Sequence, residues 1–154
     1  MKKIIYAVTI LVLIYIFSSC TTPKDEVLNS IGRYESEMFY TSGGFQDFTD
    51  YAKYQYESID LKDNEYFVAM TDEDIEEFNQ YIDNFQSWVT VHENNNATNE
   101  LAVNYDFDRS IVDPDDYCYI YTKADETLSR RFDNYDVYFL DFQTNIVYYF
   151  HNNI

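Results

Sequence analysis

The most regular pattern along the chain is an apolar stripe at helical spacing between residues 72 and 88. Thr71 precedes an acidic segment and lies three positions before Asp74, the spacing of a capping box at a helix N-terminus. The apolar residues that follow are separated by steps of three and four positions: Ile75, Phe78, Ile82, Phe85 and Val89. Polar residues occupy most positions between them, so the pattern predicts an amphipathic helix over 72–88 that packs on a sheet.

After residue 100 the apolar positions alternate with polar ones, which is typical of half-buried strands. The short connection 143–145 joins the last two such segments closely enough for a hairpin. Two earlier segments are also apolar enough for strands, and Gly43-Gly44 marks a turn after the first of them. We therefore expect strands over residues 34–40, 66–70, 101–107, 117–122, 135–142 and 146–151.

The segment 45–56 is ambiguous because two patterns overlap in it. Phe45, Phe48 and Ala52 recur at roughly helical spacing, whereas the tyrosines at 51, 54 and 56 favour extended structure. We give more weight to the spacing and predict a helix over 45–56. The expected fold is then α+β, an antiparallel sheet of about four to six strands with one or two helices packed on one face.

The N-terminal twenty residues have the three-part layout of a secretory signal peptide. Lys2 and Lys3 form a positive start, residues 4–17 are uncharged and mostly apolar, and small residues follow. A membrane-spanning helix needs about 20 apolar residues, so this run is short for a permanent span. Export followed by cleavage is the favoured interpretation.

The end of this segment, Phe17-Ser18-Ser19-Cys20, resembles the lipobox of bacterial lipoproteins, although Leu or a β-branched residue is usual at the position of Phe17. The resemblance covers residues 1–20 only. It implies a diacylglycerol on Cys20 and cleavage before it, and hence a domain anchored to the bacterial cell membrane outside the cytoplasm. The expected organisation is a signal peptide 1–19, a lipidated tether 20–26 and one globular domain 27–154. The alternative is an ordinary signal peptide in which Cys20 is incidental.

Charge and aromatic content narrow the classes of partner. The chain has 28 acidic and 10 basic residues, a formal net charge of −18. Such a charge repels nucleic acid and anionic lipid head groups and attracts cationic proteins, cationic peptides and divalent metals. With 17 Tyr and 12 Phe, the chain also has enough apolar surface to fold. We expect a folded acidic domain that does not bind nucleic acid.

A cysteine nucleophile is not indicated. If Cys20 is lipidated, Cys118 has no partner for an intrachain disulfide. Cys118 alternates with tyrosines in Tyr-Cys-Tyr-Ile-Tyr and shares a face with Ile120, which predicts a buried and inert thiol. His92 and His151 are the two histidines, and neither has a recognisable partner in sequence.

An acidic cluster near residue 110 is the first candidate site. Hard cations such as Ca²⁺ take six to eight oxygen ligands on a bent loop, and this cluster could supply several. The spacing is not that of an EF-hand, and a solvated turn is the competing interpretation. The candidate metal ligands are Asp106, Asp108, Asp113, Asp115 and Asp116.

A second candidate is the aromatic and polar segment 45–56, which could stack on a sugar or a peptide. Core packing with outward polar residues would give a similar pattern. The candidate ligand-binding residues are Phe45, Asp47, Phe48, Asp50, Tyr51 and Tyr54.

These observations favour a non-enzymatic binding or interaction module whose partner is a cationic protein, a peptide or a glycan. No cofactor is predicted. Two alternatives stay open: a cell-wall or glycan hydrolase that uses an Asp/Glu pair, which no single pair in the sequence identifies, and an envelope domain stabilised by calcium.

Overall fold

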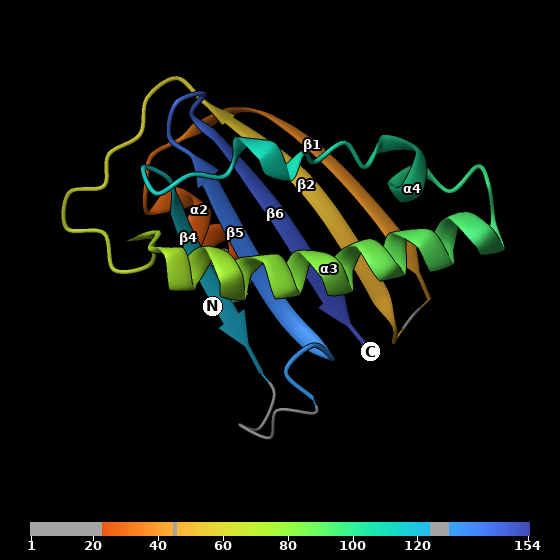
Figure 1. Ribbon diagram of the computed structural model, residues 1–154. Coiled ribbons are helices and arrows are strands. Elements are labelled where there is room, and N and C mark those ends of the chain that lie inside the picture. Colours follow the sequence, from red (N-terminus) through yellow and green to blue (C-terminus); the bar gives the residue numbers. More distant parts are fainter. Residues whose placement is uncertain (1–22, 45, 124–129) are drawn as a thin grey trace, which may run out of the picture.

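The computed structural model, which describes residues 23–44, 46–123 and 130–154, has one antiparallel sheet of six strands in the order β1-β2-β6-β5-β4-β3 (Figure 1). The long helix α3 crosses one side of this sheet, and the short helix α2 lies behind it. The strands are β1 (Tyr34–Gly43), β2 (Phe48–Tyr56), β3 (Val68–Ala69), β4 (Tyr117–Thr122), β5 (Asn134–Asp141) and β6 (Ile146–Asn153). The helices are α2 (Pro23–Asn29), α3 (Asp72–Asn95), α4 (Glu100–Asn104) and a 3₁₀ turn, η1 (Arg109–Ile111). The α+β class is as expected.

Helix α3 confirms the clearest prediction and extends it. Thr71 caps the helix: its hydroxyl accepts a hydrogen bond from the Asp74 amide, and the Asp74 carboxylate accepts one from the Thr71 amide. Four of the five stripe residues are buried against the sheet, namely Phe78, Ile82, Phe85 and Val89. The helix continues past residue 88 to Asn95, so the predicted end was too early.

The helix predicted over 45–56 is wrong, because residues 48–56 form strand β2. Strand β2 lies between β1 and β6 and is covered on both faces. Tyr51 faces α3, whereas Ala52 and Tyr54 face the opposite side of the sheet. Because β2 is buried on both faces, its apolar and polar residues do not alternate in the way that identifies a half-buried strand. The spacing of its apolar residues therefore resembled that of a helix.

The strand predicted over 101–107 is also wrong, because residues 100–104 form helix α4. Asn99 caps this helix by accepting a hydrogen bond from the Ala102 amide. Leu101 is fully buried, whereas Val103 is 66% exposed, so the alternating apolar residues do not share one environment. The predicted strand 66–70 is reduced to the two residues of β3.

Both predicted turns are present. In the β5–β6 hairpin the Asp141 carboxylate accepts hydrogen bonds from the amides of Gln143 and Thr144, and Asn145 adopts a positive φ of 56°. Gly43 ends β1 with a φ of 127°, and a Cβ there would lie 2.2 Å from the carbonyl oxygen of Asp47. Only glycine fits that backbone position.

The two faces of the sheet carry separate cores. The α3 face is covered by α3, α4 and the segment that leads to β4, and its buried residues include Phe78, Phe85, Phe139 and Phe150. The α2 face is covered in part by Val27, Leu28 and Ile31, which pack on a surface rich in tyrosine. Helices α3 and α4 thus share one face, where α4 takes the place of the second helix predicted over 45–56, and α2 adds a helix on the other face.

Helix α2 begins at Pro23, so residues 23–26, which the sequence assigns to a tether, are helical. The signal-peptide region and Cys20 lie outside the described residues. Among the helices that the structure describes, none combines the length and the apolar character needed to cross a membrane.

The two edges of the sheet differ. Strand β3 closes one edge with two residues, whereas β1 forms the other with ten residues that are mostly exposed. Met38 and Phe39, neighbours on β1, are 47% and 42% exposed and point to opposite faces.

Candidate functional site

The strand register aligns tyrosines across the α2 face. Tyr149 of β6 lies directly opposite Tyr138 of β5, which lies opposite Tyr119 of β4. The ring centroids are 4.9 Å apart in the first pair and 5.9 Å in the second. Tyr66, which precedes β3, adds an edge-on contact to Tyr119 at 5.3 Å. Opposed residues on one face of a sheet contact each other, so this row forms a continuous aromatic wall.

A polar row runs beside the aromatic one, two positions away on each strand. It places His151 of β6 opposite Asp136 of β5, and Asp136 opposite Tyr121 of β4. Asp136 is the centre of the row: its Oδ1 accepts hydrogen bonds from His151 Nδ1 at 2.8 Å and from the Tyr149 hydroxyl at 2.6 Å. The two rows are therefore linked through the Tyr149 hydroxyl.

The environment of Asp136 favours its ionised form. Burial acts to raise the pKa of this carboxyl, but the hydrogen bonds from His151 and Tyr149 and the positive charge of Lys123 outweigh burial and lower it. Burial, together with the charge of the same carboxylate, raises the pKa of the Tyr149 hydroxyl. Asp136 is thus a fixed negative charge among tyrosine rings.

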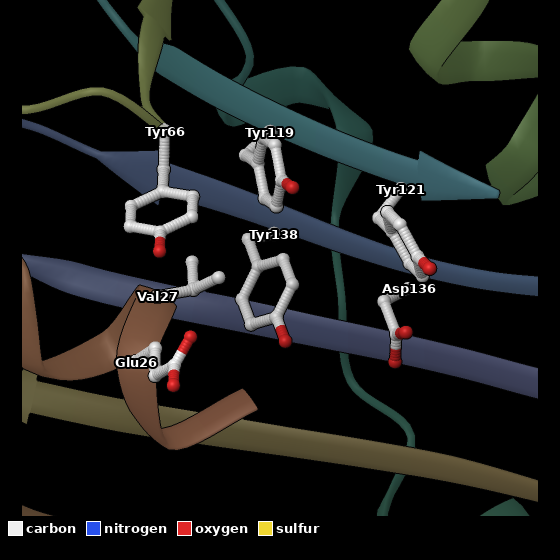
Figure 2. Close-up of a pocket in the computed structure, with 7 residues that line it drawn as sticks. All are labelled: Glu26, Val27, Tyr66, Tyr119, Tyr121, Asp136 and Tyr138. Carbon is white, nitrogen blue, oxygen red and sulfur yellow. The ribbon is translucent and has the colours of Figure 1, made fainter. Parts of the chain in front are cut away.

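These rows and helix α2 enclose a cavity of about 190 Å³, which we call the tyrosine pocket (Figure 2). Strands β4 and β5 form its floor, and α2 contributes Glu26 and Val27 from one side. Its lining consists of Glu26, Val27, Tyr66, Tyr119, Tyr121, Asp136 and Tyr138. Tyr121 is 41% exposed at the mouth, whereas Tyr138 is 2% exposed at the base.

The chemistry of this lining suits a positively charged group. Tyrosine rings present a negative π face to a cation, and the pocket adds the carboxylates of Glu26 and Asp136. The described lining includes no lysine, arginine or histidine. An anionic group would meet repulsion from both carboxylates, and the basic groups that act on Asp136, namely His151 and Lys123, lie outside the lining.

Glu26 and Asp136 are also one Asp/Glu pair that lines a single cavity, which is the arrangement to compare with a hydrolase. A glycosidase needs one carboxylic acid that is protonated near neutral pH and therefore has a raised pKa. The pKa of Asp136 is lowered instead. Asp136 thus suits electrostatic attraction or a nucleophilic role better than proton donation.

The predicted stacking segment does not form one site. Phe45 lies outside the described residues. Asp47 and Phe48 line a smaller cavity of about 100 Å³ beside Trp88 and His92. The remaining three residues are buried: Tyr51 on the α3 face, and Asp50 and Tyr54 on the α2 face.

The first predicted metal ligand, Asp106, is an ion-pair partner on the α3 side. Its carboxylate accepts hydrogen bonds from Lys53 Nζ at 2.5 Å and from the Tyr51 hydroxyl at 2.8 Å. These bonds outweigh burial and lower the pKa of Asp106. Tyr51 and Asp106, which sequence reasoning assigned to two different sites, therefore contact each other.

The other predicted metal ligands stabilise turns. Asp108 caps η1 and Asp113 accepts from the Asp115 amide. Asp116, which is 1% exposed, accepts from the amides of Asp113 and Phe142. Among the described residues no group of three or more His, Cys, Asp or Glu side chains is placed to hold a metal ion. The five aspartates therefore do not converge on a common point.

Cys118 is buried as predicted, and burial raises the pKa of its thiol to about 12. The thiol lies in the α3-face core. At neutral pH it is protonated, which makes it a poor nucleophile.

The tyrosine pocket was not among the sites predicted from the sequence. The alternation of tyrosines at 117, 119 and 121 was a signal, because it places all three on one face of a strand. The partners of that face are Asp136, from the neighbouring strand β5, and Glu26, from a helix far away in the chain that the sequence assigned to a tether.

Comparisons with protein-family models, with curated protein sequences and with solved structures found no match for this chain.

Proposed function

We propose that this chain is a lipid-anchored protein of the bacterial envelope that binds cationic groups, such as the side chains of lysine and arginine on a partner, in the tyrosine pocket. The observation that carries the proposal is the lining of that pocket, in which four tyrosines and two carboxylates converge without a basic residue. The non-enzymatic binding module indicated by the sequence thereby gains a defined site and a class of ligand.

Aromatic and electrostatic contributions would act together in this pocket. A cation over an aromatic face gains about 0.5–1 kcal/mol at an exposed site and about 2 kcal/mol when desolvated. The charge of Asp136 is fixed by two hydrogen bonds, so its attraction for a cation needs little reorganisation. The formal net charge of −18 would also speed the approach of a basic partner.

The proposed anchor rests on the lipobox-like segment that ends at Cys20. Helix α2 begins at Pro23 and supplies Glu26 and Val27 to the pocket. A lipid on Cys20 would therefore hold the pocket close to the bilayer, where it would meet partners at the membrane surface. Mass spectrometry of the membrane fraction tests this part, and an unmodified N-terminal segment that still carries residues 1–19 would refute it.

The binding proposal can be tested on the full-length chain in a non-ionic maltoside detergent. The probe is n-butylammonium, with n-butanol as an uncharged molecule of similar shape, and the measurement is the NMR shift of tyrosine ring signals. We expect saturable shifts for Tyr119, Tyr121 and Tyr138 with the ammonium only. Equal responses to both probes would refute cation recognition.

Substitutions locate the response. Tyr121→Ala should weaken n-butylammonium binding about fivefold, because an exposed cation–π contact of about 1 kcal/mol is lost. Phe142→Ala is the matched control, since Phe142 is 44% exposed and does not line the pocket. Unchanged binding by Tyr121→Ala, or an equal loss in both variants, would exclude the tyrosine pocket as the site.

A hydrolase is the second candidate because Glu26 and Asp136 share one cavity. Turnover of purified peptidoglycan by the full-length chain, with loss in both Glu26→Gln and Asp136→Asn, would support it over simple binding. If both variants lose cation binding and the parent chain shows no turnover of peptidoglycan, the binding module would be supported.

A further inference from the structure

The α2 face already holds one cation, the ammonium group of Lys24 on α2. Its Nζ lies 4.4 Å from the ring centroid of Phe39, 5.2 Å from that of Tyr54 and 5.1 Å from that of Tyr149. The Glu37 carboxylate lies 3.9 Å away and also accepts a hydrogen bond from the Tyr54 hydroxyl at 3.1 Å. Three rings and a carboxylate around an ammonium group form an aromatic cage. We call these residues, Phe39, Tyr54, Tyr149 and Glu37, the lysine cage.

The lysine cage adjoins the tyrosine pocket. Tyr149 of the cage and Tyr138 of the pocket face each other across β6 and β5, with ring centroids 4.9 Å apart. Helix α2 lies over both sites, since Lys24 enters the cage and Glu26, two residues later, lines the pocket. One face of the sheet thus carries two neighbouring sites with the same chemistry.

The lysine cage is open enough for its occupant to exchange. The Lys24 and Glu37 side chains are 23% and 37% exposed, and Phe39 is 42% exposed on the edge strand β1. Tyr54 and Tyr149 form the buried base of the cage. An incoming ammonium group could replace Lys24 from the solvent side without opening either core.

We infer that the lysine cage and the tyrosine pocket form one bipartite site for ligands with two or more ammonium groups, and that such a ligand displaces Lys24. This inference rests on the proposed function of the tyrosine pocket. Lys24 competes with the second ammonium group of the ligand, so the apparent affinity is reduced by the fraction of molecules in which Lys24 fills the cage. Ligands with one ammonium group, bound in the pocket, would not meet this competition.

The experiment compares spermidine, which carries several ammonium groups on short methylene chains, with n-butylammonium. Both are titrated into the full-length chain and into Lys24→Ala, with tyrosine ring signals as the readout. We expect Lys24→Ala to bind spermidine about tenfold more tightly, because the internal competitor is gone, with new shifts at Tyr54 and Tyr149. Its affinity for n-butylammonium, read at Tyr119 and Tyr121, should change less than twofold in this comparison.

Further variants test whether the gain in spermidine affinity comes from the lysine cage or from a general change in charge. Lys24→Arg keeps a cation in the cage and should bind spermidine as the parent chain does. In the Lys24→Ala background, Phe39→Ala should cancel the gain because it removes the exposed wall. Met38→Ala, the exposed neighbour on the opposite face, should retain the gain.

The inference is overturned if Lys24→Ala binds spermidine no more tightly than the parent chain, or if the gain survives Phe39→Ala. It is also overturned if Met38→Ala cancels the gain as fully as Phe39→Ala. Failure of the proposed function is read separately, as the absence of an n-butylammonium response at Tyr119 and Tyr121 in the parent chain.

Discussion

The two faces of the sheet use aromatic residues in different ways. On the α3 face, rings pack on rings: Phe78 contacts Phe139 at 5.2 Å, and Phe107 contacts Phe150 at 5.0 Å. On the α2 face the rings are mostly tyrosines, and a carboxylate accepts a hydrogen bond from the hydroxyls of two of them, Tyr54 and Tyr149. The first arrangement excludes water and stabilises the fold, whereas the second holds charged groups in place through hydrogen bonds and ion pairs.

Aromatic richness alone therefore does not identify a binding surface. Helix α3 and α4 cover their face with a broad apolar layer, so its aromatics are needed for packing. Helix α2 covers only part of the other face, and the polar row with Asp136 and Tyr121 lies beside it. The α2 face differs in two respects: a helix covers only part of it, and it holds a fixed negative charge.

The largest expected effect is on the α3 face. Phe78→Ala should lower the free energy of unfolding by about 3–5 kcal/mol, because a fully buried ring would leave a cavity among three other phenylalanines. Urea unfolding followed by circular dichroism measures it. Val103→Ala, at a 66% exposed position, is the control and should change stability by less than about 0.5 kcal/mol. A loss below 1 kcal/mol for Phe78→Ala would mean that this face is not a packed core.

The next effect is on the α2 face. Asp136→Ala should cost about 1–3 kcal/mol, because His151 and the Tyr149 hydroxyl would lose their acceptor in a buried place. Asp136→Asn, which keeps an acceptor oxygen, should cost less. Equal losses in the two variants would show that charge, rather than hydrogen bonding, stabilises this row. Chemical denaturation at neutral pH gives both values.

The same carboxyl predicts that part of the stability contributed by the α2 face depends on pH. The folded-state pKa of Asp136 is lowered from its ordinary value of 3.8, so its contribution to stability is present above that value and is lost as pH falls through the folded-state pKa. The difference in unfolding free energy between the parent chain and Asp136→Asn should therefore shrink on acidification below about pH 4. A difference that grows in acid would contradict the lowered pKa.

Two buried tyrosine hydroxyls give the smallest and most direct comparison. On the α2 face the Tyr56 hydroxyl donates a hydrogen bond to the Leu28 carbonyl at 2.8 Å and so connects α2 to the sheet. On the α3 face the Tyr135 hydroxyl donates one to Asn84 Oδ1 at 3.1 Å. Tyr56→Phe and Tyr135→Phe should each cost about 1 kcal/mol. Hydrogen exchange should increase in α2 for Tyr56→Phe alone, and increased exchange in α3 instead would contradict the assigned contact.

The predictable parts of the fold were those with a complete local signal. Helix α3 has a capping box and an apolar stripe within one segment, and the β5–β6 hairpin has alternation and a short connection. Strand β2 was mistaken for a helix because both of its faces are buried. Helix α4 is five residues long, too short to establish a helical period.

The candidate site was out of reach for a different reason. The register of β4 on β5 and of β5 on β6 brings Tyr119, Asp136 and Tyr149 into adjacent rows. Helix α2, far away in the chain, then completes the pocket with Glu26 and Val27. The stacking proposal selected residues that are neighbours in sequence, such as Tyr51 and Tyr54, which the strand sends to opposite faces. Proximity along a strand is poor evidence for a shared site.

The long outer edge of β1 has a consequence for how copies of this protein behave in concentrated solution. Along that edge, ten residues of backbone have no neighbouring strand within the described sheet, a geometry that invites edge-to-edge aggregation. Glu35 and Glu37 project from the same strand, so two such edges repel each other through like charges. Colloidal stability thus depends on acidic side chains, and light scattering should rise when both glutamates are replaced by glutamine.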